Sequence, residues 1–129
     1  MEERRGVGLT QSEWYVMDCL WEQAPQTVMQ LVGQLSRKVG WAKSTTITTL
    51  NRMEAKGLVR STPEGRGKQY HPCVLREEAV KSETRSFLDR VYRGSVGLMV
   101  SAMAEDNALT REEIDQLYAI LKQAEEGSK

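Results

Sequence analysis

The sequence has few of the residues that build cofactor sites and covalent frameworks. Its 129 residues include two cysteines, Cys19 and Cys73, and one histidine, His71. Two cysteines so far apart do not indicate a disulfide framework, and one histidine leaves no set of spaced metal ligands. We find no nucleophile–base pair, and Gly65-x-Gly67 lies in an expected hairpin rather than in a phosphate-binding loop. We therefore expect no metal, no cofactor and no enzymatic activity. Cys19 falls among apolar helix residues, so we expect a buried thiol.

Long apolar runs are also absent. The chain is 40% hydrophobic and 28% charged, with a mean hydropathy of −0.52, and no run approaches the roughly 20 residues that a membrane-spanning helix needs. Residues 1–8 are charged and lack the apolar centre of a secretory signal. We therefore expect a cytoplasmic protein with no membrane insertion, made of one domain or of a small domain with an extension.

The net charge is zero, but the charges are unevenly placed. Residues 1–74 carry a net charge of +3 and residues 75–129 a net charge of −3. Residues 37–68, here called the basic segment, hold eight basic and two acidic side chains, a net charge of +6. A local positive field of this size is typical of a surface that binds nucleic-acid phosphates.

Residues 41–57 form the centre of that segment and are expected to fold as one helix. Ile47, Leu50 and Met53 recur at three-residue steps, and Gly57 is placed to end the helix. The other face is expected to be polar and carries Lys43, Ser44, Thr45, Thr46, Thr48, Thr49, Asn51 and Arg52. Threonine is a poor helix former, so helix stability does not explain the threonines on this face. Hydroxyls beside basic groups can form hydrogen bonds with phosphates and base edges. The alternative is a threonine-rich surface helix with no ligand.

Two helices are expected before this one. Thr10 and Glu13 have the spacing of a capping box, which predicts a helix that ends near Pro25. Its Trp14 and Trp21 are expected to be packing anchors. A second helix, capped by Thr27, is expected over residues 28–38, and Gly40 marks the break before residue 41.

A hairpin is expected after the third helix. Residues 58–62 and 68–72 have strand character, and residues 63–67 form a turn in which two glycines supply unusual backbone angles. Arg66 and Lys68 lie at its tip. Three helices followed by a basic hairpin indicate a winged helix-turn-helix domain over residues 1–74.

Residues 75–129 are expected to be a helical arm with breaks near Gly94, Gly97 and Asn107. Its last helix opens with a second capping box, Thr110 and Glu113. The apolar residues expected to dimerise with a second copy are Phe87, Leu88, Val91, Val96, Met99, Val100, Met103, Ile114, Leu117, Tyr118 and Leu121. The alternative is an arm that folds back on its own domain.

Several of these motifs are shared with a known family. They are Leu9-Thr10-x-x-Glu13-Trp14-x-Val16-Met17-x-x-Leu20-Trp21, Trp41-x-x-Ser44-Thr45, Thr49-Leu50-x-Arg52-Met53-x-x-Lys56-Gly57, Tyr70, Phe87-Leu88-x-x-Val91-Tyr92-x-Gly94 and Leu109-Thr110-x-x-Glu113-Ile114-x-x-Leu117. With these, the sequence resembles the BlaI/MecI/CopY repressors, winged-helix dimers that repress β-lactamase, methicillin-resistance or copper-homeostasis operons.

The resemblance implies a repressor that binds a palindromic double-stranded operator as a homodimer. The family's DNA contacts fall on Lys43, Ser44, Thr45, Thr48 and Arg52, with wing contacts on Arg66 and Lys68. In its β-lactamase branch a membrane sensor-protease triggers cleavage of an Asn-Phe bond, and the aligned position here is Ala102-Met103. In its copper branch paired Cys-x-Cys motifs bind metal, and this sequence has no cysteine after Cys73. We therefore expect proteolytic release, with a metal-responsive repressor or a winged-helix protein-interaction module as alternatives.

Overall fold

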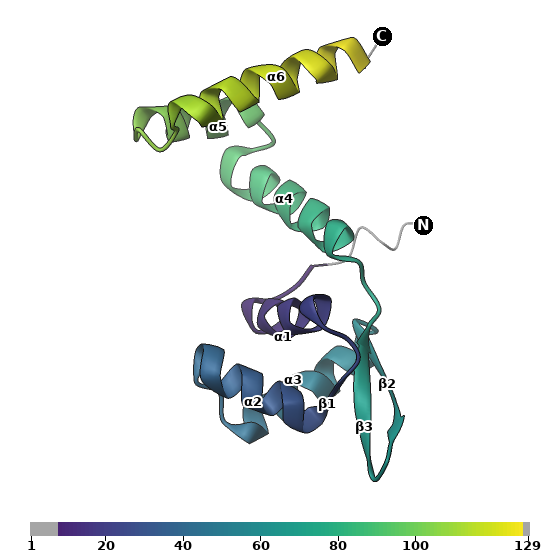
Figure 1. Ribbon diagram of the computed structural model, residues 1–129. Helices are drawn as coiled ribbons and strands as arrows, with labels where there is room; N and C mark the ends of the chain where they lie inside the picture. The colour runs from purple at the N-terminus through teal and green to yellow at the C-terminus, as the bar shows by residue number, and fades with distance from the viewer. Residues whose placement is uncertain (1–7, 128–129) are drawn as a thin grey trace. The chain divides into compact units, whose positions relative to one another are not determined.

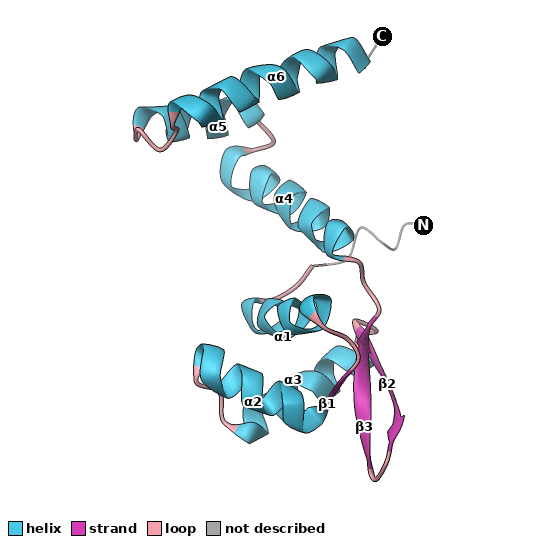
Figure 2. Cartoon of the chain, viewed as in Figure 1, coloured by secondary structure: helices cyan, strands magenta, loops and turns pink. Residues whose placement is uncertain are grey.

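The computed structural model describes residues 8–127 (Figures 1 and 2). Residues 1–7 and 128–129 lie outside the described residues, and with them most of the N-terminal segment that we expect to carry no secretory signal. The chain divides into two compact units, one up to Thr84 and one from Arg85 onward. In residues 8–127 no helix combines the length and the apolar character that crossing a bilayer requires.

The first unit is a winged helix. Its elements are α1 (Gln11–Glu22), β1 (Gln26–Thr27), α2 (Val28–Val39), α3 (Lys43–Ala55), β2 (Val59–Glu64), β3 (Gly67–Pro72) and the first part of α4 (Arg76–Tyr92). The strands form one antiparallel sheet in the order β1-β3-β2, and the β2–β3 hairpin lies beside α3 (Figure 1). The predicted fold class, mainly α with a winged helix-turn-helix, is confirmed. The two-residue strand β1, which pairs with Gln69 and Tyr70, was not predicted because two residues show no periodicity.

The predicted helix boundaries follow from local chemistry. Thr10 and Glu13 form both bonds of the capping box of α1, and Thr27 and Gln30 do the same for α2. Gly40 ends α2 in the left-handed conformation, with φ at 72°. Both capping assignments are confirmed.

The core of the first unit lies among its three helices and the sheet. Its largest fully buried side chains include Met17, Leu20, Leu31, Leu35, Leu50, Met53 and Tyr70. Trp14 and Trp21 pack edge to face with centroids 5.6 Å apart, and the Trp21 indole donates to the Val74 carbonyl at 2.9 Å. Both tryptophans are therefore packing anchors, as predicted. Cys19 is buried, also as predicted, and burial raises the pKa of its thiol.

The hairpin turn is tighter than predicted. The turn holds only Gly65 and Arg66, because strand pairing continues through Pro63 opposite Lys68 and Glu64 opposite Gly67. Pro63 is tolerated since β2 is an edge strand, where a missing N–H costs no ladder bond. Only one of the two glycines, Gly65, has a positive φ, at 58°. The prediction of a five-residue turn with two unusual glycines was wrong.

The second unit comprises the end of α4, then α5 (Val96–Glu105) and α6 (Arg111–Gly127). Ser95 caps α5, and Thr110 and Glu113 form both capping-box bonds at the start of α6. The breaks near Gly94 and Asn107 are confirmed, and both residues have positive φ. No break occurs at Gly97, which lies inside α5. That prediction was wrong because Ser95 is the N-cap residue, so α5 begins at Val96, and a glycine in the first turn is tolerated.

Candidate functional site

The exposed face of α3 presents a row of polar side chains. Ser44, Thr48 and Arg52, spaced at i, i+4 and i+8, share one side of the helix and are all exposed. Lys43 and Thr45, in the first turn, are exposed as well. The five α3 residues that were predicted to contact DNA are thus all available to a ligand.

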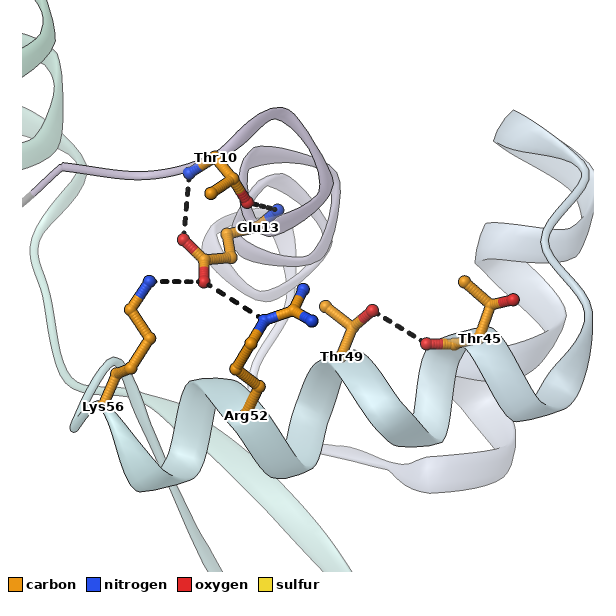
Figure 3. Close-up of polar contacts among 6 residues, drawn as sticks. All are labelled: Thr10, Glu13, Thr45, Thr49, Arg52 and Lys56. Atoms are coloured by element: carbon orange, nitrogen blue, oxygen red, sulfur yellow. Dashed lines mark hydrogen bonds and ion pairs between the residues drawn. The ribbon is translucent and has the colours of Figure 1, made fainter.

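Two threonines predicted on this polar face lie instead in the core. Thr46 and Thr49 are buried, because the core-facing stripe of α3 is Thr46, Thr49, Leu50 and Met53, a spacing of i, i+3, i+4 and i+7. Ile47 is only partly buried. The Thr49 hydroxyl donates to the Thr45 carbonyl at 2.8 Å, which satisfies it without solvent (Figure 3). The prediction failed because the apolar residues alone suggested a stripe one position away from the true one.

The beginning of α3 differs from that of α1 and α2. Ala42 is its N-cap residue, and no side chain caps this end. The first N–H groups of a helix lack internal acceptors, and the helix dipole places partial positive charge there. The start of α3, next to Lys43, is therefore suited to a phosphate oxygen.

The hairpin, here called the wing (residues 59–72), carries one tethered and one unpaired cation near its tip. Lys68 lies 3.9 Å from Glu54 of α3 and over the ring of Tyr70, at 5.6 Å from the centroid. Glu54 also accepts from the Ser61 hydroxyl at 2.7 Å, so one carboxylate joins α3 to both strands. Arg66 is exposed in the turn and forms no ion pair within residues 8–127.

A buried carboxylate behind α3 was missed by the sequence reasoning. Glu13 of α1 is 0% exposed. Its Oε1 accepts from the Thr10 N–H at 2.9 Å, and its Oε2 accepts from Lys56 Nζ at 2.7 Å and lies 3.8 Å from Arg52 Nε (Figure 3). The sequence shows the capping box but not that the same glutamate faces the C-terminal half of α3.

Glu13 is ionised at neutral pH. Burial raises the pKa of its carboxyl group. The hydrogen bonds from Lys56 and Thr10 and the charges of Lys56 and Arg52 lower this pKa by more, so that it lies below its ordinary value. The buried negative charge is therefore paired with Arg52 of α3 and with Lys56, the C-cap residue of that helix, rather than neutralised by a proton.

The second unit presents an open apolar groove between α5 and α6. Its volume is about 610 Å³, and it is lined by Val96, Gly97, Val100, Ser101, Leu109, Ile114, Leu117, Tyr118 and Leu121. Of the other residues predicted to dimerise, Phe87, Val91 and Met103 are exposed and Met99 is half-buried. Leu88 is already buried within the single chain. The aligned cleavage position, Ala102-Met103, lies exposed in the last turns of α5.

Comparisons with known proteins agree with this geometry. Residues 9–123 match the family described as "Penicillinase repressor". The penicillinase repressor of Bacillus licheniformis is 30% identical over 115 residues, which cover 89% of this chain and 90% of the relative. The methicillin resistance regulatory protein MecI of Staphylococcus aureus (strain N315) is 23% identical over 113 residues, covering 88% of this chain and 92% of MecI.

A solved structure shares the fold of the first unit. The solution structure of the DNA binding domain of the repressor BlaI matches with a TM-score of 0.52 and 24% identity, over 60% of this chain and 93% of that domain. The predicted resemblance to the BlaI and MecI repressors is confirmed, and this is a family of regulators rather than enzymes. The chain belongs to the penicillinase repressor family and is a winged-helix, DNA-binding transcriptional repressor.

Proposed function

We propose that this repressor binds an inverted-repeat operator in double-stranded DNA as a homodimer, with one α3 in each half-site. The observation that carries the proposal is the near absence of a core in the second unit. Among its described residues, 85–127, Leu88 is the one buried side chain. Helices of this length hold their shape mainly by packing an apolar face against a partner, and here that face is open.

The exposed apolar surface gathers on α5 and α6. Tyr118 is 73% exposed and Leu121 is 60% exposed, although both line the groove with Val96 and Leu117. A monomeric protein rarely leaves a large contiguous apolar patch in water. A second copy would bury the groove in a two-fold contact, in which the same patch serves both chains.

Within each half-site, α3 would lie in the major groove as the recognition helix. Lys43, Ser44 and Thr45 at its start, followed by Thr48 and Arg52, can reach base edges and the phosphates beside them. On the wing, Arg66 would contact phosphate, and Lys68 would add to the local field. Two half-sites met by one dimer raise the affinity, because the second contact is intramolecular.

The repressor would act in the cytoplasm, and a membrane sensor-protease would trigger cleavage of its arm. This cleavage would release the repressor from DNA. The Ala102-Met103 bond lies near the end of α5, and the chain leaves the helix after Glu105. The end of a helix opens at lower cost than its centre, so a protease would gain access there. A cut at this bond would separate α6 from the DNA-binding unit and remove half of the groove.

Operator selection tests the proposal. We would incubate the protein with random-sequence duplexes, sequence the retained DNA, and measure the mass of the complex by light scattering. The proposal expects an inverted repeat bound by two chains, with half-site centres about one or two helical turns apart. Selection of a single, unrepeated site occupied by one chain would refute it.

A further inference from the structure

The two oxygens of the buried Glu13 carboxylate have different partners. Oε1 accepts the Thr10 N–H at 2.9 Å and so completes the cap of α1. Oε2 faces α3, with Lys56 Nζ at 2.7 Å and Arg52 Nε at 3.8 Å. The side chain is 0% exposed, whereas those of Arg52 and Lys56 are 49% and 44% exposed. A carboxylate behind the recognition helix therefore holds two cations that reach solvent.

The cap alone does not explain a negative charge at this position. The same chain opens α2 with an identical capping box in which the glutamine Gln30 replaces the glutamate. Gln30 accepts the Thr27 N–H at 2.8 Å, so an amide oxygen caps as well as the carboxylate of Glu13. A buried charge is unfavourable unless it is paired, and the ion pairs of Glu13 are with Arg52 of α3 and with Lys56, the C-cap residue of that helix. The charge therefore acts between α1 and α3.

The orientation of Arg52 shows what the charge can do. Arg52 turns its Nε edge toward Glu13, and its two Nη nitrogens lie on the other side of the guanidinium, away from the carboxylate (Figure 3). A guanidinium is planar and presents its five N–H donors in fixed directions. The 3.8 Å contact is an ion pair without a hydrogen bond, and its attraction favours the orientation in which the remaining donors point away from Glu13.

We propose that Glu13 is a positioning residue for DNA binding, which holds Arg52 by its Nε edge so that the Nη donors are aligned before DNA arrives. Lys56 is the anchor of this arrangement, because its 2.7 Å hydrogen bond keeps Oε2 in place. A preoriented side chain loses less conformational freedom on binding, and this favours the complex without any contact between Glu13 and DNA. The inference rests on the proposed role of Arg52 in contacting DNA.

A double-mutant cycle tests the inference. The probes are a duplex of about 30 base pairs, selected by the unmodified protein from a random library, and a random-sequence duplex of equal length. Affinities would be measured for the unmodified protein, Glu13→Gln, Arg52→Ala and the double variant, below the unfolding temperature of each. We expect Glu13→Gln to weaken binding to the selected duplex about tenfold and binding to the random duplex much less. In the Arg52→Ala background, the same change should cost less than about twofold.

Glu113→Gln supplies a matched control. Glu113 forms the same kind of capping box on α6, with bonds of 2.9 and 3.1 Å to Thr110. Its replacement by glutamine removes the same charge as Glu13→Gln does. It lies outside the first unit, and we expect it to leave the ratio of selected to random binding unchanged. Two results would overturn the positioning role. One is an equal loss of affinity for both duplexes in Glu13→Gln. The other is a loss of binding free energy in the double variant that equals the sum of the losses in the two single variants.

Arg52→Lys keeps the test decisive if Glu13→Gln does not fold. Lysine preserves the positive charge, but its single ammonium group has no second edge that could present donors to DNA while the group is paired with Glu13. The proposal expects Arg52→Lys to bind the selected duplex about as weakly as Arg52→Ala. Recovery by lysine to within about twofold of the unmodified protein would overturn it. Unchanged binding by Arg52→Ala would instead refute the role of Arg52 in DNA binding, and with it this inference.

Discussion

Removal of the Lys56 ammonium should destabilise the first unit more than removal of an ordinary surface lysine. In Lys56→Ala, the buried Glu13 carboxylate loses its 2.7 Å partner and keeps the Thr10 N–H and the more distant Arg52. Complete removal of a buried partner costs about 3–5 kcal/mol. Lys56 is 44% exposed and Arg52 remains, so we expect about 2 kcal/mol, the value of a hydrogen bond to a charged group.

Lys38→Ala is the matched comparison. Lys38 has a similar exposure, 47%, and pairs with Glu22 at 3.3 Å, but that carboxylate is 69% exposed. An exposed pair contributes less than about 1 kcal/mol. For a domain of this size, 2 kcal/mol corresponds to a fall of about 8–16 °C in Tm. All three tryptophans, Trp14, Trp21 and Trp41, lie in the first unit, so tryptophan fluorescence during heating reports on this unit alone.

The effect should depend on pH in one direction. Because the pKa of Glu13 is lowered in the folded protein, its ion pair stabilises the fold above the usual glutamate pKa of about 4.3, and this contribution disappears as pH falls through the folded pKa. The difference in Tm between the unmodified protein and Lys56→Ala should therefore be large near neutral pH and shrink below about pH 4. Equal losses for Lys56→Ala and Lys38→Ala at neutral pH, or a gap that persists unchanged in acid, would refute this reasoning.

Other variants test the remaining features. Arg66→Ala should weaken binding to all DNA sequences about equally and reduce the slope of log affinity against log salt by about one per chain. Lys43→Ala should relax sequence specificity as well. Gel shifts at several salt concentrations would measure both effects. Leu117→Asp should place a charge in the α5–α6 groove and yield a monomer with weaker operator binding, and a dimer by light scattering would contradict the groove assignment. Thr46→Val should raise the free energy of unfolding by up to about 1 kcal/mol, since the buried Thr46 hydroxyl has no hydrogen-bond partner within residues 8–127. Thr49→Val, which breaks a 2.8 Å bond, should not, and urea unfolding compares the two.

Local chemistry made much of the fold predictable. Capping boxes at Thr10 and Thr110, the N-cap residue Thr27, and the helix-ending glycines Gly40 and Gly57 act through neighbouring residues, so the sequence alone indicates them. The division of roles between residues 1–74 and 75–129 stays a prediction, because compactness places the boundary between the units at residue 84 and says nothing about function.

The failures share a different cause, which is tertiary context. Thr46 and Thr49 are polar by type, yet they complete a core stripe that only the packing of α3 reveals. The short wing turn depends on strand pairing that continues past Pro63. Glu13 and Lys56 are 43 residues apart, so no local pattern could show that they meet. The exposed residues of α3, by contrast, were predictable because Ser44, Thr48 and Arg52 form one row whichever stripe is buried.

The most direct test of the central claim is the binding of the purified protein to the DNA upstream of its own gene, by gel shift at about 50 mM and about 200 mM salt, followed by footprinting. If two to four of Lys43, Arg52, Arg66 and Lys68 contact phosphate in each chain of a dimer, the slope of log affinity against log salt should be about −4 to −7. The account predicts this steep loss together with a protected inverted repeat. Binding that does not respond to salt, or no binding to any upstream fragment, would contradict it.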